Sequence, residues 1–313
     1  MLTHKKFVFI LGAGASQGFN FPSGPGLRAH MITKLSDAES IESHAMALTQ
    51  LERGHVEAFI KALSRSSTSS VDAFIEKRSD LMEIGKFAIA ACLIPYEMSD
   101  TLFDPQIENW YSYLYRHMAE DAKTPEEFCK NKVSFITYNY DRSLEECLGA
   151  ALATNYLLNS DQVKSIFKSI PIVHVHGQLG EHVFAARTSN TRLYNPKLDD
   201  RHYIYTAAQG IKIIHEDIDS SEEFEQARAL LKDADIVCFL GFGYFDRNLA
   251  RLRLSKSHCE LFYGTTYGLM SAELQNIRDK FKGRSFYERP GKIIQFFKTT
   301  GILFPPQKSV FDG

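Results

Sequence analysis

Three polar side chains that could do chemistry follow apolar runs of the sequence. Asn139 and Asp141 come directly after the run that begins at Val133, and His176 closes the run PIVHVH just before Gly177. An asparagine amide donates and accepts hydrogen bonds and a carboxylate accepts them, so this pair could hold an amide and a sugar. A histidine beside a permissive glycine could act as a base or as a hydrogen-bond partner. We therefore take Asn139, Asp141 and His176 as the candidate catalytic residues.

Each of these residues also has a structural interpretation. Asn139 and Asp141 could cap a helix that is predicted to begin near Ser143. His174 and His176 would project from one face of a regular strand, but no carboxylate or cysteine lies at convincing ligand spacing, so no metal is expected. His174 is predicted to be a buried structural histidine.

Two glycine-rich turns could approach a nucleotide. Gly12-Ala13-Gly14-Ala15-Ser16 follows the apolar run Phe7 to Leu11, where backbone N–H groups and the next helix N-terminus could hold a pyrophosphate. Its spacing through Gly18 is G-x-G-x-x-x-G, which departs from the usual dinucleotide pattern. Gly241-Phe242-Gly243 follows a later run, with Asp246 three residues on. The alternative is two tight turns without a ligand, with Asp246 capping a helix that starts near Asn248.

The elements that must position these residues alternate between strand and helix. The apolar runs ending at Leu11, Thr137, His176 and Leu240 indicate buried parallel strands, and helical patterns lie between them. This predicts an α/β fold with a Rossmann-like doubly wound parallel sheet, whose ligands gather at the carboxyl ends of the strands. Residues 1–313 read as one domain with a helical insertion at about 38–130. Aromatic residues of that insertion, such as Trp110 and Tyr111, are predicted to be core.

The composition excludes several classes of protein. The chain of 313 residues has a formal net charge of −2, which provides no bulk attraction to nucleic acid. No stretch approaches the roughly 20 apolar residues of a membrane span. The five cysteines are scattered without a C-x-x-C pair, which argues against a zinc ribbon and for a reducing compartment. We expect a cytoplasmic protein without metal, membrane or direct nucleic-acid contact.

The order of the four motifs along the chain resembles that of a known protein superfamily. GAGAS, T-x-NYD, V-H-G and GFG-x-x-D, each after an apolar strand, resemble the sirtuin superfamily and, more narrowly, the bacterial sirtuin-like branch of anti-phage defence systems. The resemblance spans roughly Phe7 to Gly264. It implies that NAD⁺ binds along these motifs, and its implied cofactor-binding residues are Gly12, Ala13, Gly14, Ala15, Ser16, Pro22, Ser23, Gly241, Phe242, Gly243 and Asp246.

The same resemblance implies roles for individual residues. Gly12, Ala13, Gly14 and Ser16 would line the pyrophosphate loop, with Pro22 and Ser23 in the flexible loop behind it. Asn139 would lie at the nicotinamide ribose and the attacking water, and Asp141 would hold the nicotinamide carboxamide. His176 would interact with the ribose hydroxyls. Gly241 and Gly243 would border the adenosine side.

Departures from the family narrow the implied reaction. Protein-deacylating sirtuins carry a four-cysteine zinc ribbon, and their first loop carries a G-I-P-D-F-R-like run that here reads Phe21-Pro22-Ser23-Gly24-Pro25. The resemblance therefore implies an NAD⁺ hydrolase that releases nicotinamide and ADP-ribose, a regulated effector that depletes NAD⁺ in anti-phage defence.

Other functions and partners stay open from the sequence. The alternatives are an NAD-dependent protein deacylase, a non-catalytic module that binds NAD or ADP-ribose, and, less in keeping with the motifs, a Rossmann dehydrogenase. The resemblance to the sirtuin-like branch also implies a homo-oligomer and a protein partner such as a HerA-type ATPase. The chain has no G-x-x-x-x-G-K-[ST] of its own.

Overall fold

A six-stranded parallel sheet forms the centre of the molecule. The computed structural model describes residues 1–185, 188–213 and 221–304. The strands of this sheet are β1 (Phe7–Leu11), β2 (Val133–Thr137), β3 (Ile172–His174), β6 (Ile236–Leu240), β7 (Leu261–Thr265) and β8 (Ser285–Arg289). Their order is β3-β2-β1-β6-β7-β8, and every neighbouring pair is parallel. The predicted α/β fold with a Rossmann-like doubly wound sheet is confirmed. Two short strands, β4 (Glu181–His182) and β5 (Thr191–Arg192), pair separately.

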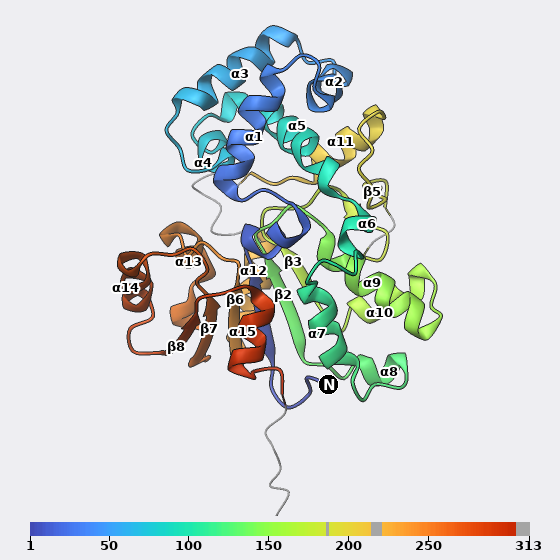
Figure 1. Ribbon diagram of the computed structural model, residues 1–313, viewed down its shortest axis with the longest axis vertical. Coiled ribbons are helices and arrows are strands. Elements are labelled where there is room, and N and C mark those ends of the chain that lie inside the picture. Colours follow the sequence, from blue (N-terminus) through green and yellow to red (C-terminus); the bar gives the residue numbers. More distant parts are fainter. Residues whose placement is uncertain (186–187, 214–220, 305–313) are drawn as a thin grey trace, which may run out of the picture.

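Alternate residues of β1 pack into two hydrophobic cores on opposite faces of the sheet. Because both faces of the strand are buried, its apolar run is unbroken. Phe7, Phe9 and Leu11 belong to a core that also contains residues of α7 (Trp110–Ala119), α9 (Ser143–Tyr156) and α15 (Ile293–Thr300). Val8 and Ile10 belong to a second core with residues of α12 (Glu222–Lys232), α13 (Asp246–Leu252) and α14 (Ser271–Lys280). Helices therefore cover both faces of the sheet (Figure 1).

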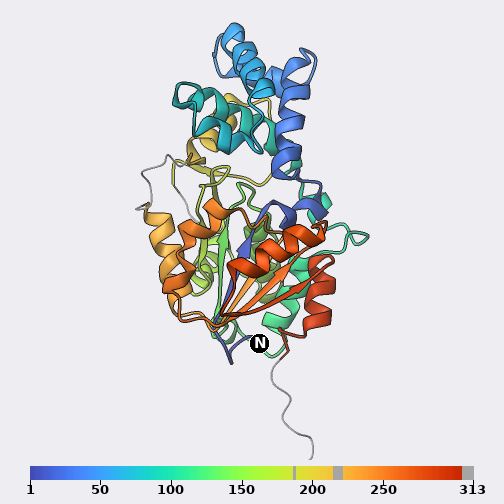
Figure 2. The same cartoon turned by 90° about the vertical axis from the view of Figure 1, so that its left-hand side faces the viewer.

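A separate group of helices, here called the helical cap, lies beyond the carboxyl ends of the strands (Figures 1 and 2). Its members are α1 (Gly24–Ser36), α2 (Ile41–Leu48), α3 (Arg53–Arg65), α4 (Val71–Ile75), α5 (Met82–Leu93) and α11 (Arg201–Gly210). Helix α11 joins it from much later in the chain, with the Tyr205 ring 4.8 Å from the ring of Phe87 on α5.

The helices within residues 38–130 divide between two places. Those up to α5 belong to the cap, whereas α7 lies against the sheet, where Trp110 packs 6.4 Å from Phe297 of α15. Helices α6 (Ser99–Leu102), α8 (Pro125–Phe128) and α10 (Ser160–Phe167) complete the arrangement. Among the described residues, no helix is long and apolar enough to cross a membrane.

The order of the strands creates one topological switch point. From β1 the chain proceeds outward to β2 and β3 on one side, and from β6 to β7 and β8 on the other. The loops that follow β1 and β6 start side by side at the middle of the sheet. Ligands of doubly wound folds bind at such a point, outside the carboxyl ends of the strands.

Candidate active site

The two glycine-rich loops pack directly against each other at the switch point. The N–H of Gly12 donates to Leu240 O at 3.1 Å, and the N–H of Gly14 donates to Gly241 O at 2.9 Å. A Cβ atom on Gly12 would lie 2.6 Å from Gly241 O, and one on Gly241 would lie 2.1 Å from the nitrogen of Ala15. Gly241 also has a φ of +59°. Close contact between the loops therefore requires these glycines, with or without a ligand.

Alanine at Gly241 is therefore expected to destabilise the protein, and alanine at Gly18 is not. Gly241→Ala brings a Cβ against the backbone of the first loop and strains a left-handed residue, which costs at least about 1–3 kcal/mol. A Cβ at Gly18 meets open space. Thermal unfolding of both variants checks this; equal melting temperatures would contradict the packing argument.

The chain after the first glycine turn differs from the sequence prediction. Two short 3₁₀ turns, Ala13–Ala15 and Gln17–Phe19, follow it, and the first full helix, α1, begins only at Gly24. The expected helix N-terminus directly behind the turn is therefore absent there. The hydroxyl of Ser23 caps α1 by accepting a hydrogen bond from the N–H of Gly26 at 3.1 Å. Pro22, just before it, is half-buried.

Four of the predicted site residues form one hydrogen-bonded cluster. Ser16 Oγ donates to Asp141 Oδ2 at 2.8 Å, and Asn139 Nδ2 donates to Ser16 Oγ at 3.2 Å and to Gly12 O at 3.0 Å. Because a main-chain carbonyl only accepts, the amide nitrogen must face Gly12, and Oδ1 is left as the acceptor of this side chain. The loops after β1 and β2 are thus joined through Asn139.

Asp141 contacts both the first glycine-rich loop and the start of α9. Its Oδ2 lies in the cluster, and its Oδ1 accepts from the N–H of Ser143 at 3.1 Å at the start of α9. Burial raises the pKa of the Asp141 carboxyl, and the hydrogen bonds from Ser143 and Ser16 oppose that rise.

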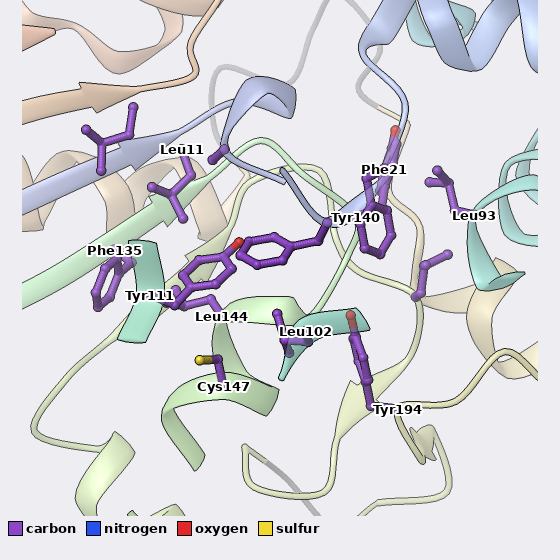
Figure 3. Close-up of a cluster of buried hydrophobic side chains, with 14 of the residues drawn as sticks. Leu11, Phe21, Leu93, Leu102, Tyr111, Phe135, Tyr140, Leu144, Cys147 and Tyr194 are labelled. Atoms are coloured by element: carbon purple, nitrogen blue, oxygen red, sulfur yellow. The ribbon is translucent and has the colours of Figure 1, made fainter. Parts of the chain in front are cut away.

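Two aromatic residues of α7 form hydrogen-bond contacts with the glycine-rich loop that follows β1. Trp110 Nε1 donates to Ala15 O at 2.8 Å, and the Tyr111 hydroxyl lies 3.4 Å from Ser16 Oγ. Tyr111 belongs to the buried cluster in Figure 3, which also holds Leu11 of β1 and Leu144 of α9. The sequence predicts both aromatic residues as core, and no sequence signal shows their polar contacts with the site.

His176 lies past the end of β3 with an unsatisfied ring nitrogen. Among the described residues, its buried Nε2 has no hydrogen-bond partner, although the residue is only 8% exposed. The rings of Tyr138, Tyr140 and Phe224 surround it at centroid distances of 5.4, 6.4 and 6.4 Å. This burial lowers the pKa of His176 to about 4; Asp72 opposes the shift, and Arg251 and Arg247 add to it. The ring is therefore neutral near pH 7 and can accept or donate one proton.

The lowered pKa of His176 predicts loss of stability in acid. The unfolded ring titrates near 6.5 and the folded ring near 4, so the unfolded state binds more protons between these values. Stability that is present above pH 6.5 is lost as the pH falls through this window, by on the order of 3 kcal/mol in full. Melting temperatures at pH 7, 6 and 5 should fall more steeply for the wild type than for His176→Gln. Parallel pH profiles would show that burial of this ring has no such effect.

The helical cap reaches the site through α4. Tyr140 follows Asn139 in the chain, and its hydroxyl donates a hydrogen bond to the carboxylate of Asp72 on α4. Glu76, at the end of α4, pairs with Arg247 and Arg251 of α13. Helix α4 is thereby held to the chain segments that follow both β2 and β6.

The rest of the GFG-x-x-D motif contributes to structure. Phe242 lies in the second core, 5.1 Å from the ring of Tyr138, and Gly243 faces the ring of Phe245. The Asp246 carboxylate is exposed and pairs with Lys280 at 2.8 Å; it forms no side-chain cap of α13. A residue that the sequence reading missed, Thr265 at the end of β7, accepts a hydrogen bond from the N–H of Gly241 at 2.8 Å.

The site thus offers a neutral histidine, an amide acceptor and a buried carboxyl at neighbouring strand ends. Such a set can position a polar substrate and handle a proton. Within residues 1–185, 188–213 and 221–304, no group of three or more His, Cys, Asp or Glu is arranged to hold a metal ion. No family model matches this chain, and no curated protein matches it.

Proposed function

We propose that this protein is an NAD⁺ hydrolase that cleaves the bond between nicotinamide and ribose and releases nicotinamide and ADP-ribose. The observation that carries the proposal is the hydrogen-bonded cluster of Asn139, Ser16 and Asp141 beside the switch point of a doubly wound sheet. His176, past the end of the next strand β3, adds a buried Nε2 without a partner among the described residues. A buried polar atom without a partner is costly, and a ligand hydroxyl would supply one. The sirtuin-like order of the four motifs supports the same reaction.

This reaction requires little covalent catalysis by the protein. The nicotinamide ring nitrogen is cationic in NAD⁺, so nicotinamide is already a good leaving group. The protein must orient the dinucleotide, stabilise a cationic ribose in the transition state and admit one water. Orientation of this kind supplies several kcal/mol of barrier reduction.

Each residue of the site has a role in this scheme. Asn139 Oδ1 would accept a hydrogen bond from the attacking water or from a ribose hydroxyl, since its Nδ2 is already hydrogen-bonded to Gly12 and Ser16. His176 Nε2 would bond a ribose hydroxyl and share its proton. Asp141 would hold the nicotinamide carboxamide.

The decisive experiment follows nicotinamide and ADP-ribose by chromatography after purified protein is incubated with NAD⁺. Stoichiometric appearance of both products supports the hydrolase. Release that requires an acyl-lysine peptide would indicate a deacylase instead. Tight binding of NAD⁺ or ADP-ribose without product, with and without candidate partners, would indicate a non-catalytic module. The role in anti-phage defence, the homo-oligomer and the HerA-type ATPase partner belong to this proposal as its cellular setting.

A further inference from the structure

Two glutamate–histidine pairs lie on neighbouring residues of α9, and they differ in their protonation. His174 Nε2 lies 2.6 Å from Glu145 Oε1, and its Nδ1 lies 3.1 Å from the main-chain oxygen of Asn139. A main-chain carbonyl only accepts, so Nδ1 of His174 must donate. The pKa of Glu145 is lowered, which favours its carboxylate; toward a carboxylate Nε2 donates as well, and the ring is then an imidazolium.

The histidine ring of the second pair is neutral by the same reasoning. His182 Nε2 lies 3.0 Å from Glu146 Oε2, but its Nδ1 accepts from the N–H of Phe184 at 3.2 Å. One nitrogen donates and the other accepts, which is the pattern of a neutral imidazole. This pair makes no contact with Asn139, so it provides a matched control.

The pKa values of the first pair agree with its geometry. Burial acts to lower the pKa of His174, but the charge and hydrogen bond of Glu145 outweigh it, and the pKa is raised. Burial acts to raise the pKa of Glu145, and the charge of His174 outweighs that effect in turn. The other titratable groups that act on the pair are Asp141, which acts on His174, and His182, which acts on Glu145.

The contact at Asn139 lies where it can set the geometry of the site. Thr137 of β2 is paired with His174 of β3, and the Thr137 hydroxyl accepts from the N–H of Asn139 at 3.0 Å. The main chain of Asn139 is therefore held at its N–H by Thr137 and at its carbonyl by His174. From that fixed turn the side chain reaches Gly12 and Ser16.

We propose that His174 is a positioning residue for Asn139: Glu145 keeps its ring doubly protonated, and its Nδ1–H anchors the Asn139 carbonyl. The proposal rests on the proposed function, because it places Asn139 in that reaction. His174, which the sequence predicts to be only structural, thereby gains a role in positioning Asn139.

The main test compares His174→Phe with His182→Phe. Each change keeps a ring and removes the histidine partner of a glutamate: the buried Glu145 in His174→Phe, and in His182→Phe the partly exposed Glu146, which keeps its hydrogen bond from Ser99. Both variants should lose thermal stability, His174→Phe more than His182→Phe. Only His174→Phe should lower kcat for nicotinamide release, on the order of 10- to 100-fold with little change in KM, because a misplaced group costs rate rather than binding. Equal kcat values in the two variants would overturn the proposal.

A double variant separates positioning from stability. Glu145→Leu with His174→Phe removes both partners, which should recover the melting temperature lost in His174→Phe, since no unpaired buried charge remains. The kcat should stay low because the anchor of Asn139 is still missing. Recovery of kcat together with the melting temperature would mean that His174 has only a structural role.

A spectroscopic experiment tests the positioning role of His174 even if the protein does not cleave NAD⁺. In ¹⁵N-labelled protein at pH 7, both ring nitrogens of His174 should have imidazolium shifts, and Glu145→Gln should convert the ring to the neutral form. The side-chain amide signals of Asn139 should shift in His174→Phe and stay in place in His182→Phe. Unmoved Asn139 signals would overturn the positioning claim, whereas absent nicotinamide release with shifted signals would overturn the proposed function alone.

Discussion

Alanine at Asn139 or at His176 is expected to reduce nicotinamide release by on the order of 100-fold or more, with the protein still folded. Asn139→Ala removes the acceptor Oδ1 and the bonds to Gly12 and Ser16. His176→Ala removes the buried Nε2 that has no partner among the described residues. The measurement is kcat for nicotinamide release, with the melting temperature of each variant recorded beside it.

Matched controls for these variants lie on the exposed surface. Asn276→Ala on α14 and His258→Ala remove the same functional groups from exposed positions. Both should keep the wild-type rate. A wild-type rate in Asn139→Ala or His176→Ala would show that the residue concerned has no role in the reaction.

The largest expected effect on stability is at Glu97. This carboxylate is fully buried and is held by two buried arginines: Arg142 Nε and Nη2 donate to it at 2.8 and 2.5 Å, and Arg192 Nη2 also donates to it. Glu97→Gln leaves two buried guanidinium groups without their counter-charge. Loss of one partner of a buried ion pair typically costs about 3–5 kcal/mol, so we expect a large fall in the denaturant midpoint.

An exposed pair of similar geometry provides the control. Arg78 binds Asp80 at 2.8 and 2.5 Å with both side chains in solvent. Asp80→Asn should leave the denaturant midpoint almost unchanged, because solvent screens such pairs. Similar effects of the two substitutions would show that burial does not decide the contribution of Glu97. The expected consequence for the site is indirect, since Arg142 follows Asp141 and is the N-cap residue of α9.

Features within single segments could be predicted from the sequence. The apolar run Phe7–Leu11 is a central strand because both of its faces are buried, and its glycine turn ends that strand as expected. Helix α9 begins at Ser143, where the capping pattern predicted it. The apolar periodicity of a segment and the residues that end it are local properties, and local properties determine the type of each element.

Other features of the site depend on residues far apart in the chain. Ser16 and Asp141 are separated by 125 positions, and Trp110 and Ala15 by 95, so nothing in either segment reveals that they bond. The same holds for the contact of the Gly12 loop with Gly241.

What the sequence by itself determined is therefore the α/β class and the placing of polar residues at strand ends. Only the tertiary structure decided that Gly12 and Gly241 are glycines because two loops touch, that Asp246 pairs with Lys280, and that His174 pairs with Glu145. The physical reason is that backbone periodicity is set by neighbours along the chain. Packing contacts, burial and protonation are set by neighbours in space, which the register of β1 between β2 and β6 brings together.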